Sequence, residues 1–195
     1  MKKQGTLFLL LGPSRVGKDS ILRGLLKIKS LKLRKLVTMT TREKRPGEIA
    51  GKTYHFVSEE IFLRKIENRE FLEWAPVRNH RFGTPRQPLL SWLRAGYNVV
   101  QQIDVRGADV LRRLEFIKVM TIFILPGSLE ELKQRLSHRH FSPEQRHIRW
   151  LETVQELKKQ TEYDYRVVNA KGELGRTIRE VAEIIKATSN VGLPR

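Results

Sequence analysis

Apolar runs alternate with amphipathic stretches along most of this chain. The first run, Thr6–Leu11, is almost uniformly hydrophobic, and similar runs recur at Asn98–Ile103, Val119–Leu125 and Tyr165–Val168. Short continuous apolar runs predict parallel strands that are buried on both faces, and the periodic segments between them predict helical crossovers. We therefore expect an α/β fold whose three-layer core is a parallel sheet covered by helices.

The remaining core elements follow from the same pattern. A second apolar segment lies near Leu36 and Val37, and helical periodicity fills most of the connections between the strands. The predicted helices span about 19–28, 108–114, 128–137, 143–160 and 174–186.

The pattern changes between Thr38 and Pro88, where apolar stretches become shorter. Ser58 followed by Glu59 and Glu60 is a good helix start, because a hydroxyl can cap free N–H groups and acids favour the positive helix end. This segment predicts a small lobe inserted into the α/β core. Its expected elements are strands at 53–57, 71–77 and 80–84 and a helix at 58–68.

The chain of 195 residues suffices for one compact domain. We expect a core formed by residues 1–37, 89–137 and 161–195, an inserted lobe at 38–88 and a lid at 138–160. Within the lid, His138–Gln145 is polar, basic and without periodicity, which favours a mobile flap.

The clearest chemical motif is Gly12-Pro-Ser-Arg-Val-Gly17-Lys18, directly after the first strand. Backbone N–H groups in such a turn and at the following helix start can bind polyphosphate, and Lys18 adds a point charge. Asp19 stands where Ser or Thr usually ligates magnesium, and Ser20 follows it. We expect Asp19 to face Mg²⁺ directly or through water, with Ser20 as a nearby hydroxyl. The alternative is a helix-start acid turned away from the nucleotide.

The inserted segment carries a second candidate anion site. Arg42 and Arg45 lie three positions apart beside the turn Pro46-Gly47, and Tyr54 follows. Arginines can fork onto a phosphate and a tyrosine hydroxyl can donate to it, although a solvated turn is an equally good interpretation. Glu73 lies in the apolar stretch 71–75, and an acceptor-only carboxylate suits the N1–H and N2 amine of guanine.

Composition narrows the function classes. There is no cysteine, which excludes disulfides, Cys-based zinc sites and thiol nucleophiles, and no stretch is long enough to cross a bilayer. We expect a soluble, cytoplasmic protein. The net charge of +17 exceeds what a kinase needs and makes nonspecific nucleic-acid binding a hypothesis, although no recognition motif accompanies it. Part of the charge clusters at Arg23, Lys27, Lys29, Lys32, Arg34 and Lys35.

Together these motifs resemble the guanylate kinase family over nearly the whole chain. The resemblance rests on the phosphate loop, TTREKRPGE, GKTYHFVS, FLEWA, FGT, AGYNVVQQIDVRGA, SLEELKQRL and EYDYRVVN. It implies a P-loop nucleoside monophosphate kinase with a core, a GMP-binding lobe and a lid. Such an enzyme transfers the γ-phosphoryl group of ATP to GMP with Mg²⁺.

The resemblance also implies roles for individual residues. Lys18, Arg42, Arg139 and one of Arg146 or Arg149 would act in catalysis. ATP would contact the loop and the lid side at Gly12, Pro13, Ser14, Arg15, Val16, Gly17, Lys18, Asp19, Ser20, Arg135 and Arg139. GMP would contact Thr38, Arg42, Arg45, Tyr54, Glu73, Phe82, Thr84 and Asp104.

Two departures from the family affect substrate binding. Phe82 replaces a tyrosine that donates to the GMP phosphate, and losing a hydrogen bond to a charged acceptor costs about 1–3 kcal/mol. We therefore expect weaker GMP binding. Arg15 replaces a loop glycine and would be strained if the backbone there needs a positive φ, yet it could add a cation near phosphate.

Two further departures concern the lid and the sheet. Trp150 replaces a lid arginine, for which Arg146, on the same helical face, or the adjacent Arg149 could substitute. Gln102 replaces a family acid. These changes are compatible with a divergent or slow enzyme.

Two alternatives to a GMP kinase remain open. The run Gly17–Ser20 is also similar to that of ribose 1,5-bisphosphate phosphokinase, but Glu73 and the TTR-x-x-R-P-G-E motif favour guanine-nucleotide recognition. The other alternative is a noncatalytic guanylate-kinase-like module that binds a phosphopeptide or protein. Lys18 argues against that, because a module without ATP chemistry does not need the loop lysine.

Overall fold

The structure is a computed structural model that describes residues 4–137 and 142–190. Strands and helices alternate along the chain. In the first half they are β1 (Thr6–Leu11), α1 (Lys18–Lys27), η1 (Lys29–Leu31), β2 (Leu33–Lys35), β3 (Met39–Thr40), β4 (His55–Phe56), α2 (Glu59–Glu67), β5 (Phe71–Val77), β6 (His80–Pro85) and α3 (Arg86–Arg94). In the second half they are β7 (Asn98–Gln102), α4 (Val105–Arg112), β8 (Lys118–Pro126), α5 (Leu129–Ser137), α6 (Pro143–Lys158), η2 (Lys159–Glu162), β9 (Tyr165–Asn169) and α7 (Leu174–Asn190).

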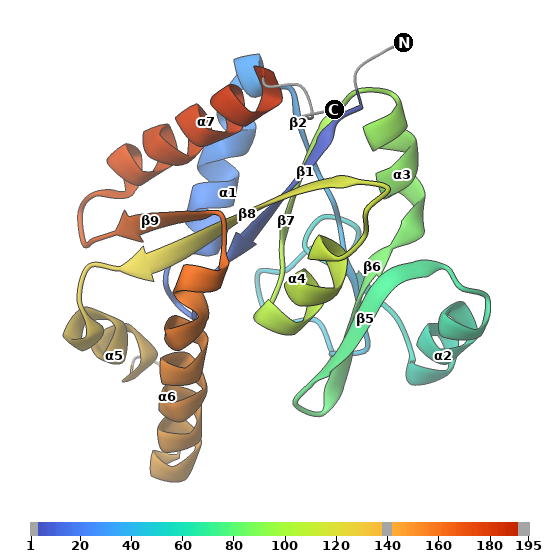
Figure 1. Ribbon diagram of the computed structural model, residues 1–195. Coiled ribbons are helices and arrows are strands. Elements are labelled where there is room, and N and C mark those ends of the chain that lie inside the picture. The colour runs from blue at the N-terminus through green and yellow to red at the C-terminus, as the bar shows by residue number, and fades with distance from the viewer. Residues whose placement is uncertain (1–3, 138–141, 191–195) are drawn as a thin grey trace.

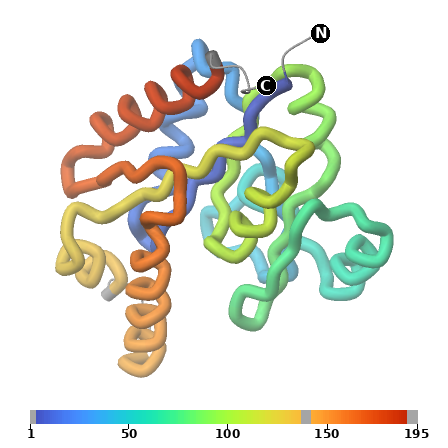
Figure 2. The backbone as a smooth tube through the Cα atoms, viewed as in Figure 1, coloured from blue at the N-terminus to red at the C-terminus, as the bar shows by residue number. Residues whose placement is uncertain are grey.

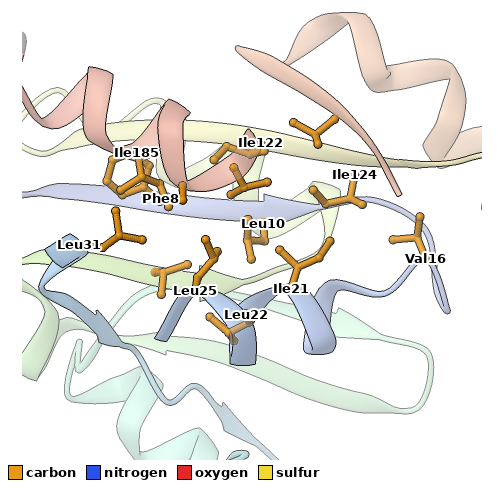
Figure 3. Close-up of a cluster of buried hydrophobic side chains, with 14 residues drawn as sticks. Phe8, Leu10, Val16, Ile21, Leu22, Leu25, Leu31, Ile122, Ile124 and Ile185 are labelled. Carbon is orange, nitrogen blue, oxygen red and sulfur yellow. The ribbon is translucent and has the colours of Figure 1, made fainter. Parts of the chain in front are cut away.

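The larger sheet is parallel, with the strand order β2-β7-β1-β8-β9 (Figure 1). Strand β1 is the central strand of this sheet. All six of its residues are buried, because helices cover both faces of the sheet. Phe8 and Leu10 point toward α1 and α7, whereas Leu7 and Leu9 point toward α3 and α4. Phe8 and Leu10 belong to the hydrophobic cluster that β1 forms with α1 and α7, which Figure 3 shows. The α/β class with helices on both faces is therefore confirmed.

The smaller sheet has four strands in the order β4-β3-β6-β5, and β5 and β6 form an antiparallel hairpin. It is formed by the segment in which the sequence pattern predicts short strands. Figure 2 shows α2, which follows this sheet's β4, at the right of the molecule, and α6 extending downward from its left half. The hairpin turn reaches toward α6, because Arg78 forms an ion pair with Glu152 at 2.6 Å. The division of the chain into core, lobe and lid remains a prediction.

Some local predictions were wrong in their bounds. The second core strand covers Leu33–Lys35 and not Leu36 and Val37. Strand β4 has only two residues, and α3 was not expected at all. Helix α4 begins at Val105 instead of Ala108, because the Asp104 carboxylate accepts a hydrogen bond from the Gly107 N–H at 2.9 Å and caps the helix.

The predicted flap at 138–145 is wrong in its second half. Ser142 and Gln145 form a capping box at the start of α6, in which each side chain binds the other's backbone N–H. Residues 138–141 lie outside the described residues. Within 4–137 and 142–190, no helix has both the length and the apolarity needed to span a bilayer.

Candidate active site

The loop after β1 is shaped by backbone conformations that favour glycine. Gly12 has φ 123° and Gly17 has φ 106°, and a Cβ atom at Gly12 would lie 2.3 Å from the Ile124 carbonyl oxygen. Both positions therefore require glycine. Arg15 also has a positive φ, 68°, so the predicted strain at this departure from the family is present.

Residues distant in sequence hold the loop from below. The side-chain amide of Asn169, at the end of β9, donates to the Val16 carbonyl at 2.8 Å. The Thr177 hydroxyl in turn donates to Oδ1 of the same Asn169 side chain at 3.2 Å. Arg135 on α5 donates to the same Val16 carbonyl at 3.4 Å while forming an ion pair with Glu131. The family resemblance implies that Arg135 contacts ATP, and Arg135 lies against the loop that would bind the phosphates.

Lys18 turns back over the loop that precedes it. Its ammonium donates to the carbonyl oxygens of Gly12 and of Pro13, the latter at 2.9 Å. Burial lowers the pKa of Lys18, while the carboxylates of Glu156, Asp19 and Asp104 act in the opposite direction. A partly buried cation held by neutral carbonyls is ready to bind an anion in their place.

The two departures Asp19 and Gln102 contact each other. The Gln102 amide, at the end of β7, donates to the Asp19 carboxylate at 3.0 Å. The Asp19 carboxylate, in the first turn of α1, therefore lies beside both the phosphate loop and the end of β7. Ser20 accepts a hydrogen bond from Arg23 at 3.3 Å.

Arg42 is the centre of the predicted second anion site. Only 8% of the residue is exposed, and its guanidinium binds both carboxylate oxygens of Glu48, at 2.7 and 3.0 Å. The rings of Tyr54 and Phe56 flank this guanidinium at 5.4 and 5.7 Å. Burial disfavours the Glu48 carboxylate, but hydrogen bonds from Arg42 and from the Arg45 N–H outweigh it and lower the pKa of Glu48. The solvated-turn interpretation therefore does not describe Arg42.

Glu73 lies inside the protein and is not on an exposed strand face. Only 7% of the residue is exposed, and it accepts a hydrogen bond from the Thr84 hydroxyl at 2.5 Å. Burial raises the pKa of Glu73 to about 7, against the opposing effect of the Thr84 hydrogen bond. The Gln101 amide in turn donates to the Thr84 oxygen at 2.6 Å. Three side chains from β5, β6 and β7 thus form one buried relay.

One cavity of about 240 Å³ joins the phosphate loop to this relay. The cavity brings together residues that were predicted to contact ATP and residues that were predicted to contact GMP. Three of the predicted GMP contacts, Arg42, Arg45 and Thr84, do not line it. The lining residues are Gly12, Ser14, Lys18, Thr38, Tyr54, Glu73, Ala75, Val77, Phe82, Gly83, Gln101, Gln102, Ile103, Asp104 and Glu156.

Two polar lining residues, Glu156 and Gln101, were not expected from the sequence. Glu156, on α6, faces the cavity; burial raises its pKa to about 7, and the charge of Lys18 opposes that rise. Glu152 and Glu156 are four residues apart and so share one helical face, a signal that could have pointed to it. Gln101 was read as part of an apolar strand, and no sequence signal distinguished it.

The catalytic roles of the lid arginines stay predictions. Arg146 is exposed on the first half of α6, and Arg149 follows on the same helix. Trp150 packs near Lys133, whose ammonium lies 5.9 Å from the ring centroid. Arg139 lies outside the described residues. The described side chains among these, of Arg146, Arg149 and Trp150, do not line the cavity.

A glycine-rich phosphate loop on a parallel sheet faces a buried carboxylate across one cavity, with an arginine site in the adjoining lobe. This fold and site define a P-loop kinase that acts on a small acceptor. Within the described residues, no three His, Cys, Asp or Glu side chains are grouped so as to hold a metal ion.

The comparisons with known proteins assign the family. The family model for guanylate kinase matches residues 4–188, so the chain belongs to the guanylate kinase family. It is 41% identical to a guanylate kinase of Caldanaerobacter subterraneus subsp. tengcongensis over 96% of this chain and 89% of that protein. It is 39% identical to one of Symbiobacterium thermophilum over 95% and 87% of the two chains.

A solved structure supports the same assignment. The guanylate kinase of Anaplasma phagocytophilum has a TM-score of 0.80 and 29% identity to this chain. The match covers 97% of this chain and 89% of that one. The expected family resemblance is confirmed.

Proposed function

We propose that this protein is an ATP:GMP phosphotransferase, which makes GDP from GMP. The observation that carries the proposal is the buried Glu73 carboxylate, which lines the same cavity as Lys18. Guanine offers an N1–H and an N2 amine side by side, and only an acceptor pair such as a carboxylate satisfies both. The guanylate kinase relatives favour this function over a ribose bisphosphate kinase or a noncatalytic binding module.

The residues of the cavity have separate tasks. Lys18 and the loop N–H groups would neutralise the phosphates of ATP, because phosphoryl transfer needs positioning and charge neutralisation more than acid–base chemistry. Arg42, together with Arg45 and Tyr54, would hold the GMP phosphate, and ligand phosphate would compete with Glu48 for the Arg42 fork. Thr38 and Asp104 would contact the guanosine around Glu73.

Asp19 and Ser20 fit a role toward Mg²⁺. Mg²⁺ prefers oxygen ligands such as carboxylate and hydroxyl, and the Asp19 carboxylate lies beside the loop with an amide donor as its hydrogen-bond partner. When bound with ATP, Mg²⁺ neutralises charge on the transferring phosphates. Asp19 would otherwise repel those phosphates.

An acceptor panel tests the main proposal. ATP consumption is measured with GMP, dGMP, AMP, UMP and ribose 1,5-bisphosphate as acceptors, and GMP is expected to give the largest kcat/KM. Glu73→Gln should reduce the preference for GMP over AMP more than it weakens ATP binding, because only the guanine donors need the carboxylate. Turnover of ribose bisphosphate without turnover of GMP would refute the proposal.

A magnesium titration tests Asp19. Asp19→Asn should raise the Mg²⁺ concentration for half-maximal rate and for ATP binding measured by calorimetry, whereas Asp19→Ser should keep activity. Asn keeps an oxygen that can accept from Gln102, so the variant isolates the charge. Unchanged titrations together with a lower melting temperature would make Asp19 a helix-start stabiliser only.

The excess positive charge supports nonspecific nucleic-acid binding as a second property. No Asp or Glu occurs from Ser20 to Arg42 or from Trp74 to Ile103. Both stretches reach the β2 edge of the sheet, where the Arg34 guanidinium lies 3.8 Å from the centroid of the Tyr97 ring. Phosphates would bind the basic groups, and the aromatic ring offers a stacking surface for bases.

Fluorescence anisotropy with labelled single-stranded RNA tests this property. The affinity should fall steeply with added salt, and the double variant Lys29→Ala/Lys32→Ala should weaken binding more than Lys186→Ala on α7. No binding at low salt would refute it. We also propose a cytoplasmic location, where both nucleotide substrates are found, to be checked by cell fractionation.

A further inference from the structure

Gln101 is an unusual residue for its place in the fold. It lies on β7 next to the central strand, only 1% of it is exposed, and Val99 and Val100 precede it as buried aliphatic residues. A buried amide is costly unless its groups are hydrogen-bonded. Its Oε1 is, among the described residues, the one buried side-chain polar atom without a hydrogen-bond partner. Gln101 nevertheless lines the cavity, so it borders the substrate site.

The hydrogen bonds around Gln101 have a defined direction. The Thr84 hydroxyl has a single hydrogen, and its oxygen lies 2.5 Å from Glu73 Oε1 and 2.6 Å from Gln101 Nε2. When Glu73 is ionised, its carboxylate can only accept, so the hydroxyl hydrogen then points to Glu73. The amide must then donate to the Thr84 oxygen, which fixes Nε2 on that side and leaves Oε1 without a donor.

We propose that Gln101 is a positioning residue for acceptor specificity. By donating to Thr84 it commits the Thr84 hydrogen to Glu73, and thereby keeps Glu73 an ionised acceptor for the N1–H and N2 amine of guanine. The inference deepens the proposed GMP kinase activity and rests on it. Gln101 acts through Thr84 and Glu73 and need not touch the reacting atoms.

The relay also couples Gln101 to the protonation of Glu73. A protonated Glu73 would donate to Thr84, the Thr84 hydrogen would turn away from it, and the Gln101 amide would have to rotate to accept. In its present orientation Gln101 therefore favours the ionised carboxyl. Burial, the Asp104 charge and the Thr84 hydrogen bond are the other influences on that carboxyl. Removing the amide should raise the pKa of Glu73.

The test uses Gln101→Leu, in which a side chain of similar size lacks both the donor and the unpartnered acceptor. We expect the KM for GMP to rise about tenfold with kcat within about threefold of wild type, on the scale of one lost hydrogen bond near a charge. The acid limb of the pH profile of kcat/KM for GMP should move to higher pH, because Glu73 must be ionised to accept. The KM for ATP should not change.

Thr121→Val is the matched control. Thr121 is another fully buried polar residue in the same sheet, and its hydroxyl donates to Asp164 away from the cavity. This variant should lower the melting temperature without changing the KM for GMP or the acid limb. Gln101→Leu should instead change the KM for GMP and the acid limb without lowering the melting temperature, because it also removes an unpaired buried oxygen.

Two further variants keep the test decisive if Gln101→Leu folds poorly. Gln101→Met is equally apolar and more adaptable, and it should reproduce the KM and pH effects. In the double variant Gln101→Met/Thr84→Val, the effect on GMP should equal that of Thr84→Val alone, since the relay is already broken. Unchanged KM and acid limb, or additive effects in the double variant, would overturn the inference. Absence of GMP turnover by the wild-type protein would instead refute the proposed function.

Discussion

The donor and acceptor sides of the cavity are built by different means. On the donor side, positive φ angles at Gly12, Arg15 and Gly17 shape one short loop, so backbone conformation determines the site. On the acceptor side, Glu73 is held by side chains that are distant in sequence. Thr84 follows Glu73 by 11 positions, and Gln101 follows Thr84 by 17.

This difference separates the effects of substitutions. Backbone N–H groups bind any polyphosphate, so changes in the loop should affect turnover with every acceptor. Changes in the side-chain relay should instead alter which acceptor is preferred. The predictions below test this separation.

Lys18→Met should have the largest effect, lowering kcat by about 10³-fold with GMP and with AMP alike, because a buried cation near the transferring phosphoryl is lost. Steady-state kinetics with both acceptors measures it. Lys27→Met, at the other end of α1, is the control and should behave as wild type. Activity within tenfold of wild type would contradict the assigned role of Lys18.

Arg42→Lys should raise the KM for GMP by about 10–100-fold and leave the KM for ATP unchanged. Lysine keeps the charge but cannot fork onto a phosphate or bind Glu48 through two nitrogens. The control is Arg64→Lys on α2, whose exposed pair with Glu60 should contribute little. An equal rise in both KM values would show that Arg42 does not belong to the acceptor side alone.

The lid should contribute a smaller, acceptor-independent effect. Arg139→Ala, and one of Arg146→Ala or Arg149→Ala, should each lower turnover at least about tenfold, the equivalent of 1.4 kcal/mol of transition-state stabilisation. Trp150→Arg should be tolerated. If all three alanine variants remain within about twofold of wild type, the lid supplies no charge to the reaction.

Phe82→Tyr should produce a modest gain. The ring lies 5.8 Å from that of Tyr54 at the cavity wall, and a hydroxyl there would restore the donor that the family tyrosine supplies. We expect the KM for GMP to fall about fivefold, on the scale of one hydrogen bond. Phe116→Tyr, at an exposed site, serves as the control. An unchanged KM would mean that the hydroxyl does not reach the phosphate.

Beside its effect on acceptor preference, Glu73→Gln should have a smaller effect, on the pH dependence of stability. The pKa of Glu73 is about 7 in the folded protein against 4.5 as its ordinary value, so the folded state binds more protons between these pH values. The contribution of Glu73 to stability is therefore lost as pH rises from 4.5 to 7.

The neutral variant should consequently gain more melting temperature at pH 8 than at pH 5. The expected difference is about 2–4 °C by differential scanning calorimetry. Glu70→Gln on the exposed surface should show no such gain. An equal change at both pH values would indicate that Glu73 is not held in a proton-binding environment.

The conformation of the donor-side loop could be predicted from the sequence, because the residues that determine it are consecutive in the chain. Strand β1 is fully apolar, and the spacing from Gly12 to Lys18 encodes the turn directly. Even the strain at Arg15 could be anticipated, since a loop position usually occupied by glycine needs a positive φ.

The acceptor side could be predicted only in part. The resemblance pointed to Glu73 and Thr84, but Gln101 stands in an apolar run and acquires its partner only when β6 and β7 come together. Glu156 faces the cavity because of how α6 packs, which periodicity alone does not determine. The start of α4 was misplaced because Asp104 was interpreted only as a ligand and not as a cap.

The hydrogen bond from Asn169 to the Val16 carbonyl has a consequence for the order in which the protein is made. The loop leaves the ribosome before β9 and α7, because Asn169 follows Val16 by 153 residues in the chain. A nascent chain without Asn169 and Thr177 has the glycines and Lys18 but lacks the amide that supports the turn. Support of the phosphate loop therefore has to wait until β9 and α7 have been made and α7 has packed against α1.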